Sequence, residues 1–299
     1  MLKYDFTFAD LAAKFLETDD ASLLQQIADT DAARHLFNHA NMARYGVPRD
    51  TPLDIVNHYL LAQKSPEERK ALLPAFKANI EYAKENIVKD RAAEKIVLEY
   101  LPAGFEFSGS IFFTFGYDVG VAYGNNCSLN LAVTRKGDTV QGDELRYWAI
   151  HEMHHAGFNE FQDKELSLDI STYRDVTEII ERLTHAEAMA TYAPLEIRRR
   201  ENAMDDIFKD YITMQDADLM AQLEKEYFEI YHHFKSNPNN TLTEEDWLKL
   251  SIPDGGGKRL YYTVGARMAA TIDKKLGRER LVNLIKEPSA NFIATYLSL

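Results

Sequence analysis

Three histidines and a glutamate lie within five residues, in the run His151-Glu152-Met153-His154-His155. On a helix, residues four apart lie one above the other, so His151 and His155 can bind one zinc ion together. Glu152 is about 100° further round the helix, too far to bind that ion but able to reach a water molecule that the ion holds. Zinc lowers the pKa of such a water toward about 7, and a glutamate can take its proton during attack on a carbonyl carbon. The spacing therefore predicts hydrolysis, with His151 and His155 as zinc ligands and Glu152 as general base.

A network of buried polar side chains is the alternative interpretation of this run. Buried His and Glu side chains are costly without hydrogen-bond partners, so a structural role would require partners for all of them. His154 points to another side of the helix, and we expect it to be structural. His35 and His39 share the four-residue spacing, but no acid stands near them in a motif. We therefore expect these two, and His58, at the surface or at the edge of the core.

A catalytic zinc site needs a third protein ligand from elsewhere in the chain. Metzincin peptidases carry a glycine three residues and a His or Asp six residues after the second histidine. Phe158 and Phe161 occupy those positions here, which excludes that group. Gluzincin peptidases use a glutamate from a later helix. Glu187 is the favoured candidate because small neighbours would let its helix approach closely, and Glu178 and Glu181 are alternatives.

Helices are predicted to hold these residues. Apolar residues spread around residues 142–158, which predicts a buried helix with Asp143 near its start and Gly157 near its end. Residues 172–200 predict another helix, stopped or kinked near Pro194.

The remaining segments add a small sheet and further helices. Residues 105–135 are rich in phenylalanine and punctuated by glycines, which predicts two to four strands. One of them, over residues 128–133, could align an extended peptide by strand addition. Residues 1–100 and 260–272 carry apolar stripes at helical spacing.

The order of these segments predicts a mainly α protein of the α+β class, with a zincin-like catalytic domain in which helices surround the small sheet. We expect an N-terminal helical region over residues 1–104 and a zincin-like metallopeptidase region over residues 105–299. One compact unit formed by both regions is the alternative. A chain of 299 residues is long enough for either arrangement.

Composition limits the cofactors and partners. The single cysteine, Cys127, excludes an intrachain disulfide and a multi-cysteine metal site, so a metal must be held mainly by His, Asp and Glu. The formal net charge of −13 argues against binding to nucleic acid or to an anionic membrane surface. The first twenty residues lack the uninterrupted apolar stretch of a signal peptide, which predicts a cytoplasmic location. Removal of a leader segment would instead imply a secreted or periplasmic protein.

The stretch from His151 to Ala190 resembles gluzincin metallopeptidases. In this resemblance, the segment Glu187-Ala188-Met189-Ala190 is similar to the E-G-x-A segment that carries their third zinc ligand. The run of residues 262–269 is similar to a tyrosine–glycine segment in several poorly characterised bacterial families of zinc-dependent peptidases. Two features depart from the best-known members: 31 residues separate His155 from Glu187, and Thr191 stands where the thermolysin type has an aspartate that orients a histidine.

The resemblance implies a role for a tyrosine. Tyr262 would donate a hydrogen bond to the oxyanion of the tetrahedral intermediate, because a phenol aimed at developing charge stabilises it. Tyr261 and His185 are alternatives, although His185 lies on the opposite side of its helix from Glu187.

Together these patterns favour a zinc-dependent metallopeptidase of the gluzincin kind, a hydrolase with Zn²⁺ as cofactor and a peptide or protein as substrate. A zinc hydrolase of a small-molecule amide or ester would use the same water activation. A non-catalytic protein, in which zinc or the motif alone is structural, is the remaining alternative. The sequence sets no oligomeric state.

Overall fold

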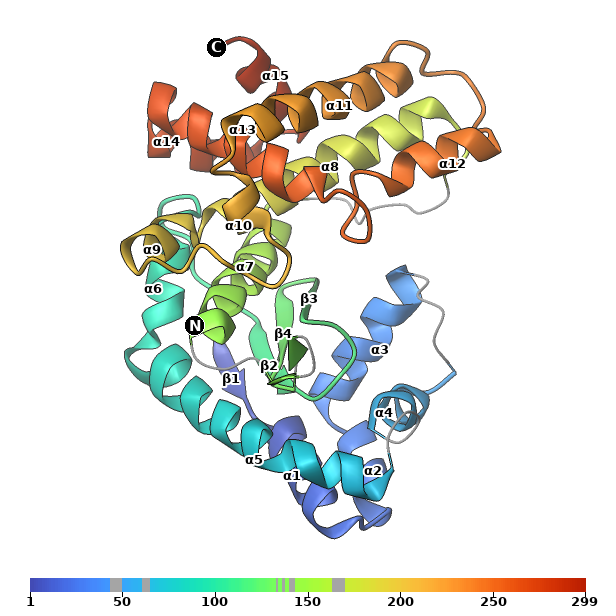
Figure 1. Cartoon of the computed structure of the whole chain (residues 1–299), viewed down its shortest axis with the longest axis vertical. Helices are drawn as coiled ribbons and strands as arrows, with labels where there is room; N and C mark the ends of the chain where they lie inside the picture. Colours follow the sequence, from blue (N-terminus) through green and yellow to red (C-terminus); the bar gives the residue numbers. More distant parts are fainter. Residues whose placement is uncertain (44–49, 61–64, 133, 136–137, 140–142, 163–169) are drawn as a thin grey trace. The chain divides into compact units, whose positions relative to one another are not determined.

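The structure is a computed structural model that describes residues 1–43, 50–60, 65–132, 134–135, 138–139, 143–162 and 170–299. The chain divides into two compact units, each built from two segments. The first unit comprises Met1–Val97 and Gly104–Glu160, and the second comprises Leu98–Ala103 and Phe161–Leu299. Figure 1 labels the elements along the chain.

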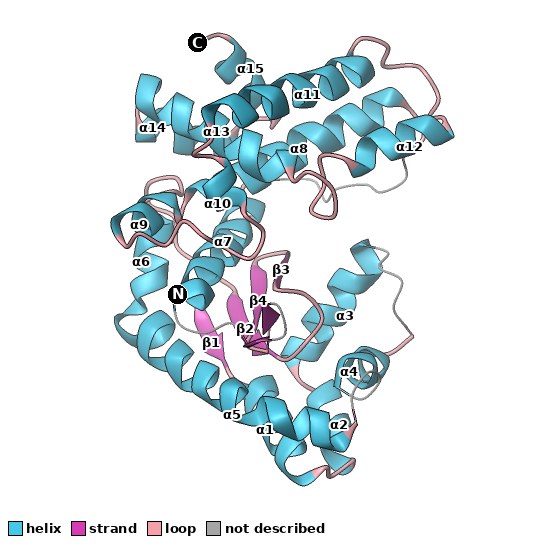
Figure 2. Cartoon of the chain, viewed as in Figure 1, coloured by secondary structure: helices cyan, strands magenta, loops and turns pink. Residues whose placement is uncertain are grey.

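The first unit contains a sheet and the helices around it (Figure 2). Its elements, in chain order, are β1 (Lys3–Asp5), α1 (Thr7–Thr18), α2 (Ser22–Ala28), α3 (Asp31–Ala43), α4 (Pro52–Leu60), α5 (Pro66–Ala83), a π-helical turn η1 (Lys84–Val88), a 3-10 turn η2 (Lys89–Arg91), α6 (Ala92–Leu98), β2 (Ser110–Thr114), β3 (Gly120–Tyr123), β4 (Asn126–Asn130), β5 (Thr134–Arg135), β6 (Asp138–Thr139) and α7 (Asp143–Asn159).

Four strands form a mixed sheet in the order β1-β2-β4-β3. β1 pairs with β2 and β2 with β4 in parallel, whereas β3 pairs with β4 in antiparallel fashion. β1 and β3 are therefore the edge strands, and β4 is paired along both sides. The expectation that the strand over residues 128–133 accepts a peptide is wrong, because its residues 128–130 lie in β4. Val133 lies outside the described residues.

Helices α7 and α3 pack on opposite faces of this sheet. On one face, Gly120 of β3 lies against Glu152 of α7. On the other, the ring of His35 from α3 lies 5.3 Å from the ring of Phe112 in β2. The strand register puts Gly120 and Phe112 in adjacent rows of paired residues, and adjacent rows point to opposite faces. The sheet is therefore covered on both sides near β3.

Local sequence explains why the sheet forms here. Residues 111–113 are buried and carry aromatic or β-branched side chains, which favour strands. The side-chain oxygen of Asn130 accepts hydrogen bonds from the backbone N–H groups of Gly116 and Ala132, at 2.9 and 2.8 Å. These bonds tie the end of β4 to the turn that follows β2.

In its described residues, the regular structure of the second unit is helical apart from an isolated bridge between Thr172 and Thr241. Its elements are α8 (Tyr173–Tyr192), α9 (Leu195–Arg200), α10 (Asp210–Thr213), α11 (Ala217–Lys235), α12 (Glu244–Ser251), α13 (Leu260–Leu276), α14 (Arg278–Asn283), a 3-10 turn η3 (Leu284–Lys286) and α15 (Ala290–Leu297). Helices α8 and α12 begin with capping boxes, in which Thr172 pairs with Asp175 and Thr243 with Asp246.

Helix α8 packs closely along α13. A Cβ atom at Gly265 of α13 would lie 2.9 Å from the Cβ of Ala188 and 3.2 Å from the carbonyl oxygen of Thr184. Any side chain at position 265 would therefore push the two helices apart. Ala188 adjoins Glu187, so this contact fixes the turn of α8 that carries Glu187.

The predicted fold class is confirmed, since the chain is mainly helical with a small mixed sheet. The helix over residues 172–200 is confirmed as α8 followed by α9. Two local features differ from expectation. Residues 1–100 include the strand β1, and α7 continues past Gly157 because that glycine lacks the left-handed φ that ends helices. No described helix is both long enough and apolar enough to cross a membrane.

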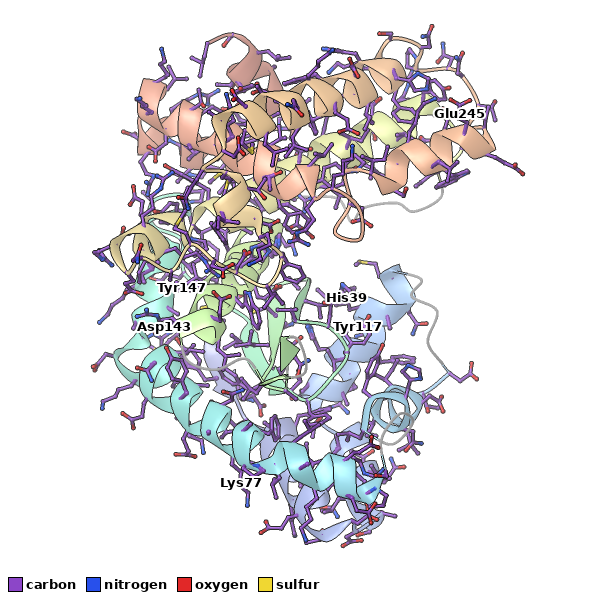
Figure 3. All side chains as sticks on the ribbon, in the orientation of Figure 1. His39, Lys77, Tyr117, Asp143, Tyr147 and Glu245 are labelled. Atoms are coloured by element: carbon purple, nitrogen blue, oxygen red, sulfur yellow. The ribbon has the colours of Figure 1, made fainter. Side chains whose placement is uncertain are left out.

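His35 and His39 are buried in the first unit, contrary to the expected surface or core-edge position, with 5% and 8% of their surface exposed. The Nε2 atom of His35 lies 3.3 Å from the carbonyl oxygen of Val121, and the Nδ1 atom of His39 lies 2.9 Å from the hydroxyl of Tyr117. Figure 3 labels His39 and Tyr117. Burial lowers the pKa of both histidines to about 4. His58 is half-buried.

Candidate metal centre

Helix α7 holds the histidine motif and is buried around most of its circumference, as its sequence predicts. Glu152 is 7% exposed, whereas His151 and His155 are half-buried. His154 is fully buried, and its ring centroid lies 6.4 Å from that of Phe158, as expected for a structural residue. The helix packs on β3 and β4, so the sheet fixes its position.

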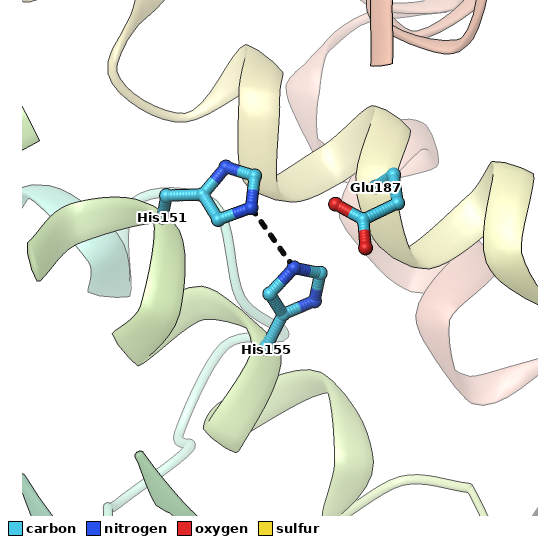
Figure 4. Close-up of side chains that lie close together, drawn as sticks. All are labelled: His151, His155 and Glu187. Atoms are coloured by element: carbon cyan, nitrogen blue, oxygen red, sulfur yellow. Dashed lines mark hydrogen bonds between the residues drawn. The ribbon is translucent and has the colours of Figure 1, made fainter. Parts of the chain in front are cut away.

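His151 and His155 face each other across one helical turn. Their Nε2 atoms lie 3.0 Å apart, and their rings meet at 80° (Figure 4). Two nitrogens bound to one tetrahedral zinc ion, each about 2.0–2.1 Å from it, would lie roughly 3.3 Å apart. The two ring nitrogens therefore converge as a shared metal ion would require.

Glu152 lies against the backbone of β3. A Cβ atom at Gly120 would be 2.5 Å from the Cγ, 2.7 Å from the Cδ and 2.8 Å from the Oε1 of Glu152. Burial raises the pKa of the Cys127 thiol, and the negative charge of Glu152 raises it further. Cys127 therefore remains an uncharged thiol beside the carboxylate. Glu152 therefore points toward β3.

The three glutamates of α8 have different surroundings. Glu178 is exposed. Glu181 accepts hydrogen bonds of 2.7 and 2.8 Å from two side chains of α11, which tie it to the packing of these helices. Glu187 is half-buried, and its charge raises the pKa of Arg259, although burial and Asp210 act on that pKa more strongly. The charge of Glu187 thus acts on a group of polar side chains at the start of α13.

Arg259 organises that group. It precedes α13 with a left-handed φ of 56°. Its guanidinium donates hydrogen bonds of 2.8–3.0 Å to both carboxylate oxygens of Asp210. The same guanidinium lies 3.7 Å from the ring centroid of Tyr262 and 4.1 Å from that of Phe208. A bidentate carboxylate and two aromatic rings hold the guanidinium, and with it the ring of Tyr262, in one orientation.

The three candidate oxyanion donors differ in burial. Tyr262 is half-buried, whereas Tyr261 is 2% exposed. His185 is fully buried, stacks on the ring of Phe292 and lies 3.3 Å from the hydroxyl of Ser289. His185 therefore belongs to the packing of α8 against α15. Of the three candidates, Tyr262 is the one that is partly exposed.

Among the residues that the structure describes, a group that could hold a metal ion comprises His151, His155 and Glu187 (Figure 4). Each is half-buried, and each offers one ligand atom. Two imidazoles and one carboxylate are the ligands of one class of catalytic zinc sites, in which a fourth position stays open for water or substrate. The chemistry of these side chains therefore fits zinc.

Two residues in contact with candidate site residues, Gly120 with Glu152 and Arg259 with Tyr262, were not anticipated from the sequence. Gly120 looked like one of several turn glycines, and Arg259 belongs to no recognisable motif. A glycine inside a strand often marks the close approach of another group, and that signal would have found Gly120. No comparable local signal exists for Arg259, because its partners lie on other segments.

Comparison with known protein families agrees with a zinc site. A sequence profile of the family described as "Putative zinc dependent peptidase (DUF5700)" matches residues 24–299. The matched segment includes α7, α8 and α13, and hence every candidate site residue. Comparisons with curated proteins and with solved structures gave no match.

Proposed function

The chain belongs to this family described as zinc-dependent peptidases, and from that premise we propose that it hydrolyses peptide bonds as a metallopeptidase of the gluzincin kind. His151, His155 and Glu187 hold the zinc ion, and Glu152 is the general base. The observation that carries the proposal is the convergence of the two histidine Nε2 atoms, 3.0 Å apart, on a helix whose Glu152 lies beside an edge strand.

A bound zinc ion would supply Lewis-acid chemistry here, activating a water molecule for attack on the substrate carbonyl. Glu152 takes a proton from the attacking water and then gives it to the leaving amine, so one carboxylate serves both proton transfers. Only 7% of the Glu152 surface is exposed. Few solvent molecules therefore compete for the proton between the two transfers.

Tyr262 donates a hydrogen bond to the oxyanion in this proposal. Its half-buried position and the contact of its ring with Arg259 support the assignment. A donor that is already held in place stabilises developing charge without reorganising during the reaction. Tyr261 and His185 are more deeply buried and therefore less suited to meet a substrate.

The outer edge of β3 is the proposed site for alignment of an extended peptide. The N–H of Asn130 donates to the carbonyl oxygen of Val119 at 2.9 Å, which makes Gly120 a non-hydrogen-bonded partner of β4. The backbone N–H and C=O groups of Gly120 and Ala122 therefore point away from β4. A peptide that pairs with these groups would run past Glu152, which lies against Gly120.

The test combines zinc analysis with peptide hydrolysis. The wild-type protein should bind one equivalent of zinc and cleave unstructured peptides. Glu152→Gln should keep the zinc and lower turnover by about 10²–10⁴-fold, because it removes the base and leaves the ligands in place. Glu160→Gln is the matched control, since Glu160 is exposed and bonds to Ser108. Undiminished hydrolysis by Glu152→Gln would contradict the mechanism, and absence of stoichiometric zinc in the wild type would contradict the metal assignment.

A further inference from the structure

Gly120 occupies an unusual position for a glycine, in the sheet rather than in a turn. It begins β3, and its φ is not among the left-handed values recorded for Gly104, Gly116, Gly124 and Gly277. The backbone conformation therefore does not require glycine. A glycine in a strand weakens the strand, so its presence here needs another reason.

The reason is the space that the absent side chain leaves. The Cγ, Cδ and Oε1 atoms of Glu152 lie 2.5–2.8 Å from the position that a Cβ at Gly120 would occupy. We propose that Gly120 is a positioning residue for Glu152: its missing side chain is the space in which the carboxylate is held over the edge of the sheet. The catalytic consequence rests on the function proposed above for Glu152, whereas the contact itself does not.

Strand β3 has little freedom to move away from an added methyl group. On one side it is paired with β4 over four residues. On the face opposite Glu152, the Nε2 atom of His35 lies 3.3 Å from the carbonyl oxygen of Val121. The atoms in the way belong to a side chain with several rotatable bonds, not to the backbone of α7. A methyl group at position 120 should therefore turn Glu152 aside and leave the helix and the strand where they are.

The first test measures catalysis in Gly120→Ala. Turnover should fall by at least about tenfold toward the level of Glu152→Gln, because a displaced carboxylate no longer reaches the attacking water. KM and zinc content should stay close to wild type, since neither depends on the Glu152 carboxylate. Gly256→Ala is the matched control, because a Cβ at Gly256 meets no atom within 4 Å. Turnover in Gly120→Ala within twofold of wild type would overturn the proposal.

The second test needs neither zinc nor activity. In the metal-free protein, Gly120→Ala should lower the midpoint of thermal unfolding by roughly 2–4 °C, the shift for about 1 kcal/mol, which is the low end of the cost of an overfilled site. The same substitution should cost much less in a Glu152→Ala background, because the atoms that crowd the methyl group are gone. Equal shifts in the two backgrounds would overturn the proposal. If the wild type hydrolyses no peptide, the proposed function fails, and this cycle still decides whether Gly120 positions Glu152.

Discussion

Gly120 and Gly265 each make room for a helix that carries a candidate acid, but in different ways. In the first unit, the space at Gly120 is filled by the Glu152 side chain itself. In the second unit, the space at Gly265 is filled by Ala188 and by the backbone of α8, and Glu187 only adjoins that contact. The first glycine therefore controls where a carboxylate lies, and the second controls how closely two helices pack.

Close packing can therefore support a site in two ways: it can position one side chain, or it can set the distance between two helices. A flexible side chain can yield to an added methyl group, so crowding at Gly120 should appear first in the chemistry. A Cβ and a carbonyl oxygen cannot yield without moving a helix, so crowding at Gly265 should appear first in stability. The following predictions test this separation, from the largest expected effect to the smallest.

A metal-binding assay should distinguish Glu187 from Glu152, because only Glu187 is a proposed zinc ligand. Glu187→Gln should lower zinc affinity by at least about 10²-fold, because the loss of a ligand exceeds the 10–100-fold cost of losing a residue that only orients one. Competition with a chromophoric chelator measures this. Glu178→Gln on the same helix is the control, since Glu178 is exposed. Wild-type zinc affinity in Glu187→Gln would remove it from the site.

Substitutions of the two tyrosines at the start of α13 should have different effects on kcat. Tyr262→Phe should lower kcat by about 10²–10³-fold with little change in KM or zinc content, as expected for loss of one donor to the oxyanion. Tyr261→Phe should keep kcat within a fewfold of wild type, because Tyr261 is buried in the packing of the helix. The opposite ranking of the two variants would transfer the role to Tyr261.

The two units should respond to acid in different pH ranges. Burial lowers the pKa of His35 and His39 to about 4. Between pH 6.5 and 4 the unfolded chain therefore binds protons that the folded chain does not, and stability falls as the pH falls. The loss approaches about 3 kcal/mol for each histidine near pH 4. Urea unfolding from pH 7 to 4.5 measures it, and His35→Gln should flatten the dependence; an unchanged slope would contradict this origin.

In the second unit, Asp246 titrates over a lower range. Burial raises the pKa of Asp246, but hydrogen bonds from Thr243, His233 and Tyr173 outweigh burial and bring it below its usual value. The stabilisation from these bonds is present above the ordinary pKa of about 3.8 and is lost as the pH falls below it. Probes in the first unit should therefore report acid unfolding at a higher pH than probes near Asp246.

The smallest effect is expected at the helix–helix contact. Gly265→Ala should lower the free energy of unfolding by about 1–3 kcal/mol, the usual cost of forcing extra atoms into close packing. Turnover per folded, zinc-loaded molecule should stay closer to wild type than in Gly120→Ala. Gly256→Ala again provides the control. A large loss of turnover with unchanged stability would erase the difference between the two glycines.

The sequence alone predicts those features that depend on residues close together in the chain. The spacing of His151 and His155 fixes their common side of a helix, and the phenylalanine-rich segment over residues 105–135 indicates the sheet. The zinc and catalytic roles stay predictions until they are measured. The division into residues 1–104 and 105–299 also stays a prediction.

What the sequence could not supply depends on distant contacts. β1 has three residues and no distinctive pattern, and its partner β2 lies about a hundred residues away. The pairing order that makes β4 central and β3 an edge is not encoded in either strand. The same holds for Gly120 against Glu152 and for Arg259 against Asp210, since each contact joins separate segments.

The parallel pairing of β1 with β2 also has a consequence for biosynthesis. Lys3 pairs with Ser110, so β1 has no partner when it leaves the ribosome until the segment around residue 110 has followed it. At about 5–20 residues per second, this delay is roughly 5–20 s. During that time α1 to α5 can form from local contacts while β1 stays unpaired. The edge of the sheet farthest from β3 is therefore completed only when β1 pairs with residues made about a hundred positions after it.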